Sequence, residues 1–168
     1  MNLALLFLLV LVACSQTEED MKLTSPAFTH DGKIPSRHTC DGEDVSPKLL
    51  ISDVPNAKSL ALIMDDPDVP RHLRADGMWD HWVRFNIPVM TREIASGSEP
   101  GVAGKGTGGN LGYKGPCPPD REHRYYFKLY ALDVVLQLPE GSTKKQVEDA
   151  MKGHVVAKTV LMGRYERG

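Results

Sequence analysis

Short apolar segments, separated by turn-forming residues, run along most of this chain and predict strands rather than long helices. Residues 48–55 (KLLISDVP) fit a strand that ends in a turn, and residues 59–64 (SLALIM) fit an apolar strand buried on both faces. Residues 121–133 (REHRYYFKLYALD) are the strongest strand candidate, because they are rich in aromatic residues and alternate in polarity. Residues 155–165 (VVAKTVLMGRY) are expected to form a final strand.

Alternation also predicts which side chains share a face of a sheet. The segment 81–87 divides into His81, Val83, Phe85 and Ile87 on one face and Trp82, Arg84 and Asn86 on the other. The same rule places one set of residues of 121–133 together: His123, Tyr125, Phe127, Leu129 and Ala131. A histidine on an apolar face is ordinarily a core residue bonded to a backbone carbonyl, but the carboxylates near His81 favour a functional site.

One helix is predicted, over residues 142–153, with Ser142 or Thr143 as its N-cap. Residues 21–47 are interrupted by prolines and glycines, so we expect short extended pieces there and no helix.

A long glycine-rich connection, residues 91–119, is too rich in glycine for a core element and is expected to wall a pocket. Residues 104–109 (GKGTGG) formally fit G-x-G-x-x-G, yet no predicted strand leads into them and prolines follow. We therefore reject a dinucleotide-binding site.

The overall composition is that of an ordinary globular protein. A chain of 168 residues without internal repeats is most simply one domain with a substantial core. The net charge of −2 gives no electrostatic bias towards nucleic acid, so binding of nucleic acid is disfavoured.

The N-terminus differs from the rest of the chain. Residues 3–13 are eleven consecutive apolar residues, too few to span a bilayer but typical of a signal peptide, which we assign to residues 1–13. The following Cys14 resembles a lipidated cysteine of bacterial lipoproteins, residues 14–21 would be its tether, and residues 22–168 the domain. These features predict a membrane-anchored lipoprotein of the cell envelope. The alternative is an incidental apolar leader, with translation from Met21 and a cytoplasmic protein.

Two cysteines remain in the domain, Cys40 and Cys117. In an oxidising compartment they are expected to form a disulfide. One alternative is a metal site that uses His38 and Cys40, but a lone H-x-C motif is a weak metal signature. Two reduced, buried thiols are the other alternative, favoured by the start at Met21.

Candidate chemistry is concentrated in residues 65–88, which hold five carboxylates, two histidines and two tryptophans between two apolar segments. Polar groups at the end of a sheet are a common setting for a binding site. Within this stretch Asp65, Asp68 and His72 are expected to be turn-forming or solvated groups.

Several motifs together resemble the phosphatidylethanolamine-binding protein family, in its bacterial branch called Raf kinase inhibitor-like. They are CDGEDVSP (40–47), DPDVP (66–70), WDHWVRFNIP (79–88), GPCPP (115–119), EHRY (122–125) and GH (153–154), and the agreement covers residues 22–165. The resemblance implies a mainly β, two-sheet antiparallel sandwich with one or two short peripheral helices. It also implies a small pocket that accepts phosphate-like anions. Carried over by motif, its residues are Asp66, Pro70, Trp79, His81, Gly115, Pro116, His123 and Tyr125.

A carboxylate in an anion pocket repels the ligand unless its charge is offset. Asp66 could hold His81 or His123 protonated, could itself be protonated, or could face a cationic head group. The resemblance and these groups lead us to expect a non-enzymatic binding protein for a lipid head group or a phosphorylated peptide, with no cofactor and no metal.

Two other functions are weighed against this one. The alternative enzyme is a hydrolase that uses the Asp and His residues as general acid and base, but the sequence lacks a nucleophile motif and a metal-binding histidine pair. An interaction protein that inhibits a kinase or protease by occupying a phosphorylated or acidic segment remains a further interpretation.

Overall fold

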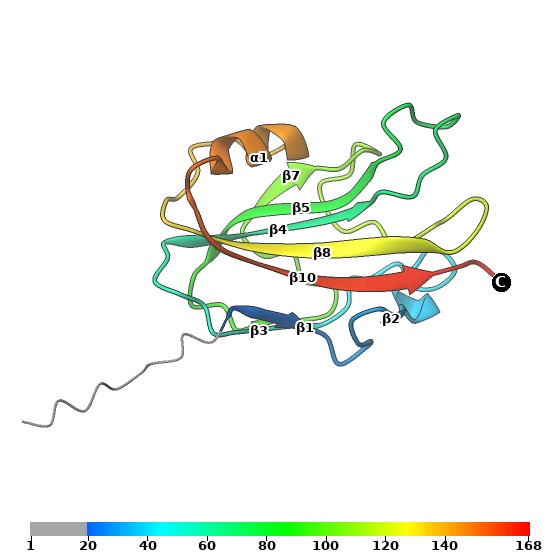
Figure 1. The fold of residues 1–168 in the computed structure, drawn as a ribbon, viewed down its shortest axis with the longest axis horizontal. Coiled ribbons are helices and arrows are strands. Elements are labelled where there is room, and N and C mark those ends of the chain that lie inside the picture. Colours follow the sequence, from blue (N-terminus) through cyan, green and yellow to red (C-terminus); the bar gives the residue numbers. More distant parts are fainter. Residues whose placement is uncertain (1–19) are drawn as a thin grey trace, which may run out of the picture.

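The structure, a computed structural model, describes residues 20–168 and is built mainly from β-strands (Figure 1). The expected signal peptide, Cys14 and most of its tether lie outside the described residues. The elements are β1 (Lys22–Thr24), β2 (Gly32–Lys33), η1 (a 3-10 helix, Ser36–His38), β3 (Leu49–Ser52), β4 (Ser59–Asp66), β5 (Trp79–Pro88), β6 (Glu93–Ile94), β7 (Val102–Lys105), β8 (His123–Leu132), β9 (Ser142–Thr143), α1 (Lys144–Met151) and β10 (Val155–Tyr165).

These strands form two sheets, as expected. The larger sheet has the order β2-β10-β8-β4-β5-β7-β9, and its long strands are all antiparallel neighbours. The smaller sheet, β1-β3-β6, lies below the larger one in Figure 1, and α1 lies on the opposite side. The fold is therefore the predicted mainly antiparallel two-sheet arrangement with one peripheral α-helix.

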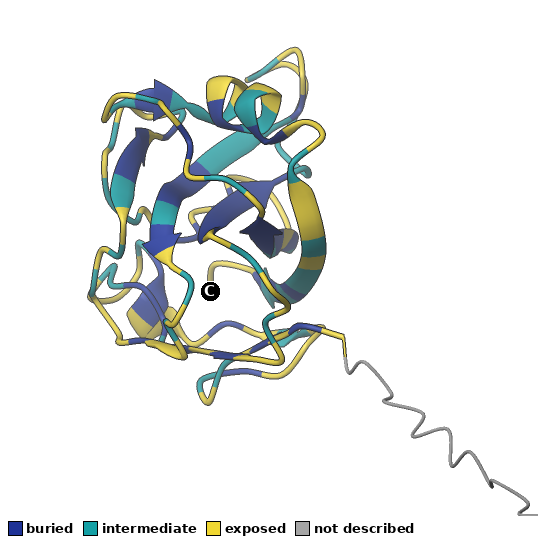
Figure 2. Ribbon diagram, turned by 90° about the vertical axis from the view of Figure 1, so that its left-hand side faces the viewer, coloured by how far each residue is buried: buried dark blue, intermediate teal, exposed yellow. Residues whose placement is uncertain are grey.

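Strand β4 is central because both of its faces are covered. All eight of its residues are buried; the continuous apolar run predicted this for residues 59–64, and the burial extends over Asp65 and Asp66. Leu60, Leu62 and Met64 belong to the core between the two sheets, whereas Ala61 and Ile63 belong to the core under α1. Figure 2 shows the same pattern, with dark blue strands at the centre and yellow loops around them.

The helix and the two longest predicted strands are confirmed. Strand β10 has the predicted bounds, and the predicted face of β8 packs into the intersheet core from Tyr125 to Ala131. Helix α1 begins after Thr143, whose side chain and that of Gln146 form a capping box. Among residues 20–168, no helix is long and apolar enough to cross a membrane.

The predicted faces of 81–87 are wrong at His81, Asn86 and Ile87 because the ladder between β4 and β5 is irregular. Met64 pairs with Trp82, but the next pair is Asp65 with Asp80, so His81 is the extra residue of a β-bulge. A bulge turns two consecutive side chains towards the same side of a strand.

As a result, His81 leaves the face that it was expected to share with Val83 and Phe85. Its ring contacts Tyr125 edge-on, with 5.3 Å between ring centroids, whereas Val83 and Phe85 pack under α1. Ile87 also moves to the intersheet core, because a second register shift of the same ladder precedes it.

Two other expectations need correction. The glycine-rich connection contains a core element, β7, which pairs with β5 and β9. A Cβ at Gly104 would lie 2.4 Å from a methyl carbon of Val83, so glycine here permits close approach rather than marking a loop. The segment 21–47, expected to have no helix, includes the single turn η1.

Cys40 and Cys117 form the expected disulfide, with 5.4 Å between their Cα atoms. The bond joins residues 77 positions apart and fixes the loop before β8 to the residue that follows Thr39. The metal-site alternative for Cys40 and His38 is thereby wrong, because the thiolate it needs is absent.

Candidate functional site

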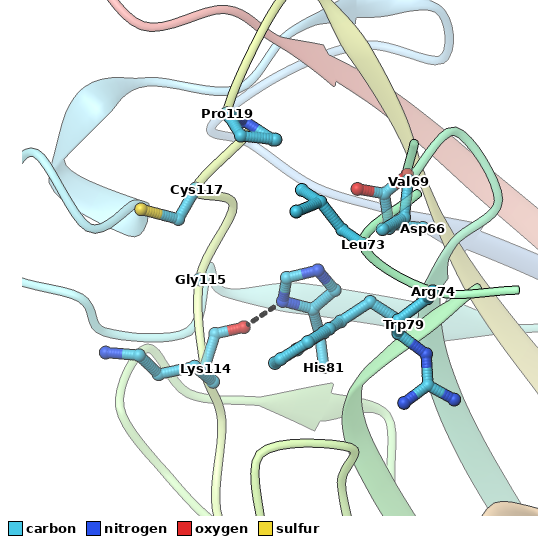
Figure 3. A pocket seen from close by; sticks show the side chains of 10 residues that line it. All are labelled: Asp66, Val69, Leu73, Arg74, Trp79, His81, Lys114, Gly115, Cys117 and Pro119. Atoms are coloured by element: carbon cyan, nitrogen blue, oxygen red, sulfur yellow. Dashed lines mark hydrogen bonds between the residues drawn. The ribbon is translucent and has the colours of Figure 1, made fainter. Parts of the chain in front are cut away.

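A cavity of about 270 Å³ lies between the loop that follows β4, the start of β5 and the segment before β8. It is lined by Asp66, Val69, Leu73, Arg74, Trp79, His81, Lys114, Gly115, Cys117 and Pro119 (Figure 3). Val69, Leu73, Trp79 and Pro119 make the walls largely apolar. Small ligand sites of this kind are lined mainly by apolar side chains, with a few polar groups that orient the ligand.

His81 supplies a polar atom to the cavity. Its Nδ1 lies 2.7 Å from the carbonyl oxygen of Lys114 and must donate, because a carbonyl only accepts. The other nitrogen, Nε2, then carries the lone pair of a neutral imidazole and points into the cavity (Figure 3). Burial lowers the pKa of His81, and the opposing effects of the Lys114 carbonyl and of Asp66 are smaller. His81 is therefore a hydrogen-bond acceptor at neutral pH.

Behind His81, three side chains form an Asp–His–Asp chain. His123 is fully buried, with Nδ1 2.7 Å from Oδ2 of Asp66 and Nε2 2.8 Å from Oδ1 of Asp120. The other oxygen of Asp66 accepts the backbone N–H of Asp68 at 2.8 Å. The cavity carboxylate thus lies at hydrogen-bond distance from His123, one of the two histidines that were expected to offset its charge if protonated.

Tyr125 lies beside both histidines. Its ring is 5.3 Å from His81 and 6.5 Å from His123, between centroids. Its hydroxyl is buried and makes no hydrogen bond within residues 20–168. Burial, followed by the charge of Asp66, raises the pKa of Tyr125 far above its ordinary value, and the nearby backbone of Cys117 opposes this without reaching hydrogen-bond geometry. Tyr125 is therefore a neutral donor without an acceptor.

The wall of the cavity formed by residues 113–117 is hydrogen-bonded to residues 38–44. The Tyr113 hydroxyl donates to the carbonyl of His38 at 2.7 Å, and the Gly115 N–H donates to Asp44 Oδ1 at 2.7 Å. A Cβ at Gly115 would lie 2.5 Å from the same His38 carbonyl. Because the disulfide joins the same two segments, this wall is held at both ends.

Two cations line the cavity without pointing into it. Lys114 directs its ammonium group to Asp44, and Arg74 pairs with Asp76 at 2.8 Å while lying over the ring of Trp79 (Figure 3). The polar groups that face the ligand space are therefore a carboxylate and an imidazole.

The eight residues carried over from the family motifs are distributed as follows. Asp66, Trp79, His81 and Gly115 line the cavity; His123 and Tyr125 lie buried behind it; Pro116 is buried in its wall; and Pro70 borders a neighbouring surface pocket. The motifs thus identify the polar base of the cavity and one of its apolar walls, Trp79, but not the rest of its apolar rim. Val69, Leu73 and Pro119 were missed, and only the 57% exposure of Leu73, an apolar residue, marks them as unusual.

Asp65, Asp68 and His72 were expected to be turn-forming or solvated. His72 is exposed, and Asp68 forms a two-pronged ion pair with Arg124. For Asp65 the prediction is wrong, because it is fully buried on the opposite face of β4 and paired at 2.6 Å with both Lys128 and Lys144.

Comparison with known proteins agrees with this fold. The family model described as phosphatidylethanolamine-binding protein matches residues 24–166. The chain belongs to the phosphatidylethanolamine-binding protein family.

Its relatives include bacterial and archaeal proteins. A UPF0098 protein of Chlamydia muridarum is 50% identical over 149 residues, covering 88% of this chain and 99% of the relative. One from Methanothermobacter thermautotrophicus is 49% identical over 156 residues, covering 88% and 100%.

Two solved structures share the fold. The phosphatidylethanolamine-binding protein homologue CT736 from Chlamydia trachomatis is 50% identical, with a TM-score of 0.86 over 89% of this chain and 99% of that one. YbcL from E. coli, described as a member of the mammalian family, is 26% identical, with a TM-score of 0.79 over 89% and 100%.

Proposed function

We propose that this chain is a binding protein whose cavity takes a small phosphate-bearing group, from a phospholipid head or a phosphorylated peptide, without chemical conversion. The observation that carries the proposal is the base of the cavity, where the carboxylate of Asp66 is engaged by His123 and leaves Nε2 of His81 to meet the ligand. The name of the family model, a binder of phosphatidylethanolamine, supports the same ligand class.

A phosphate group can satisfy the neutral His81 in two ways. A phosphate monoanion brings a proton that it donates to Nε2, and a protonated His81 donates to a dianion. Either way the complex holds one proton more than free protein and dianion together. Because phosphate esters and histidines both titrate near pH 6 to 7, affinity should rise as the pH falls through that range.

The lack of an available nucleophile favours binding over hydrolysis. Among the described lining residues, Cys117 is the one cysteine, and its sulfur is held in the disulfide with Cys40. The walls contribute no serine or threonine hydroxyl. If the phosphate group in the cavity belongs to a phosphorylated segment of another protein, the same binding would sequester that segment and make this chain a regulator of a kinase or protease.

We further propose export to the cell envelope and anchoring through Cys14. The disulfide supports this location, because such bonds persist in oxidising compartments.

Calorimetric titration with phosphorylethanolamine between pH 5.5 and 8 tests the binding proposal. We expect saturable binding that strengthens towards low pH and is lost in His81→Ala. His72→Ala is the matched control, because it removes an exposed histidine of the same loop region outside the cavity. Affinity that is independent of pH, or equal in His81→Ala and the wild type, would falsify the proposal.

A further inference from the structure

The hydrogen-bond partners of His123 include one residue outside the family motifs, Asp120. Both ring nitrogens face carboxylate oxygens at once, at 2.7 Å from Asp66 and 2.8 Å from Asp120. A neutral imidazole has one N–H, so it can donate to only one of two carboxylates. Both contacts are donations from the ring only if His123 is an imidazolium, with a proton on each nitrogen.

The alternative keeps His123 neutral and puts a proton on one carboxyl group. Asp120 is a poor place for it, because its side chain is 44% exposed and Arg121 lies 4.0 Å away. Donation from His123, followed by a backbone bond from Arg121, holds the pKa of Asp120 below its ordinary value. Asp66 already accepts a backbone N–H on one oxygen and faces His123 with the other, an arrangement suited to the ionised form.

The remaining groups around His123 do not compete with these two carboxylates. Tyr125 stacks on the ring and is neutral because burial raises its pKa. Tyr165, opposite His123 on β10, donates its hydroxyl to Asp41 at 2.8 Å. Asp66 and Asp120 are therefore the two groups that hold the charge of the ring.

We propose that Asp120 is a positioning residue that keeps His123 protonated and thereby selects an anionic ligand. The imidazolium offsets the charge of Asp66, which lines the cavity, and the remaining negative charge lies on Asp120, which is 44% exposed and does not line the cavity. Without Asp120, His123 loses its second carboxylate partner, releases a proton more readily, and leaves the charge of Asp66 exposed to the ligand. The inference rests on the proposed function, because it names the group that sets the ligand charge of that site.

The location of Asp120 supports this role. It lies three residues after the disulfide-bonded Cys117 and directly after the cavity residue Pro119. The loop is therefore fixed by a covalent bond beside the carboxylate that must meet Nε2 of His123 at hydrogen-bond distance. The side chain of Asp120 is 44% exposed, and ion pairs of exposed carboxylates ordinarily contribute little to the stability of the fold.

The first test measures the ligand-free protein, and so does not depend on the proposed function. Nitrogen-15 NMR of the histidine rings at pH 7 should show both nitrogens of His123 protonated in the wild type and in Asp120→Glu. In Asp120→Asn one nitrogen of His123 should lose its proton at a lower, more acidic pH than in the wild type. A wild-type His123 with one unprotonated nitrogen at pH 7 would overturn the inference.

The second test is calorimetric titration of the same variants with phosphorylethanolamine at several pH values. Asp120→Asn should weaken binding at pH 7 by roughly tenfold, because less of the protein then carries a protonated His123, and should shift the pH profile to lower pH. Asp120→Glu should restore both. Glu122→Gln is the matched control, because it removes an equal charge from the same loop, where Glu122 contacts Arg164 rather than His123.

The two tests separate the failures. If the wild type does not bind phosphorylethanolamine while NMR shows a doubly protonated His123, the proposed function fails and the Asp–His–Asp assignment stands. If the wild type binds but Asp120→Asn and Glu122→Gln lose affinity equally, the effect is general surface charge and the role of Asp120 is refuted.

Discussion

Removing the disulfide is predicted to destabilise the domain mainly through its unfolded chain. The bond between Cys40 and Cys117 closes a loop across a sequence separation of 77. The loop-entropy relation for a closure of this size gives about 4 kcal/mol at 25 °C. For a chain of this length that loss lowers the melting temperature by roughly 8 to 16 °C.

The magnitude depends on how well the native state survives without the bond. Non-covalent contacts join the same segments: the Cys40 N–H donates to the carbonyl of Pro116 at 3.1 Å, and Tyr113 and Gly115 contribute the two bonds to residues 38 and 44. These contacts should hold the cavity wall in place, so the variant is expected to fold to the same structure. The cost then appears in the unfolded ensemble, which becomes more expanded and raises the slope of urea unfolding.

The assay is urea unfolding of wild type and of Cys40→Ser/Cys117→Ser, followed by tryptophan fluorescence because Trp82 is fully buried. Both proteins carry Cys14→Ser, so that the third cysteine does not contribute. Reductant should remove about 4 kcal/mol from the wild type and leave the double variant unchanged. A loss below about 1 kcal/mol, outside the usual range for native disulfides, would refute the loop-entropy argument.

Three further predictions concern single residues of the site. Gly115→Ala should lower the free energy of unfolding by about 2 kcal/mol or more, because its Cβ would lie 2.5 Å from a backbone oxygen. Gly108→Ala should lower it much less, because no atom lies nearer than 3.4 Å to a Cβ there. Equal urea midpoints of the two variants would contradict this. Tyr125→Phe removes a buried hydroxyl without a partner, so stability should stay equal or rise by about 1 kcal/mol while phosphorylethanolamine binding weakens; a clear loss of stability would show a partner that the structure does not contain. Because burial lowers the pKa of His81, the unfolded chain takes up its proton first, and stability should fall as the pH drops below about 6.5, by at most about 1.4 kcal/mol per pH unit. His81→Asn should flatten that slope in urea unfolding at pH 5 to 7, and identical slopes in both proteins would disprove the assignment.

Alternation along the sequence predicts side-chain faces where a ladder is regular and fails where it contains a bulge. In β8 the ladder to β10 keeps its register from His123 to Ala131 and the ladder to β4 from Tyr126 to Leu132, and the predicted face is correct from Tyr125 to Ala131. In β5 the extra residue is His81, which moves to the site side of the sheet. The residue types found at a bulge do not differ from those at regularly paired positions, so the alternation of apolar and polar residues cannot locate a bulge.

The disulfide and the polar base of the cavity were accessible from the sequence for different reasons. Two cysteines in one domain leave a single pairing, and the family motifs identify Asp66, His81, His123 and Tyr125. Asp120 carries no such signal, because an acidic residue three positions before a histidine is common in loops. Its role depends on how the loop before β8 folds back, which is set by the disulfide and by backbone bonds far away in the sequence.

The two adjacent carboxylates at the end of β4 show what distinguishes the site from the scaffold. Asp65 and Asp66 are both buried, on opposite faces of the strand. The charge of Asp65 is balanced by two lysines. A lysine is an ordinary permanent counter-charge, so this cluster of one carboxylate and two ammonium groups belongs to the scaffold under α1. Asp66 is compensated by a histidine, the side chain whose charge changes near neutral pH. The same strand therefore buries one carboxylate with a permanent counter-charge and the other with an adjustable one, and only the adjustable one borders the cavity.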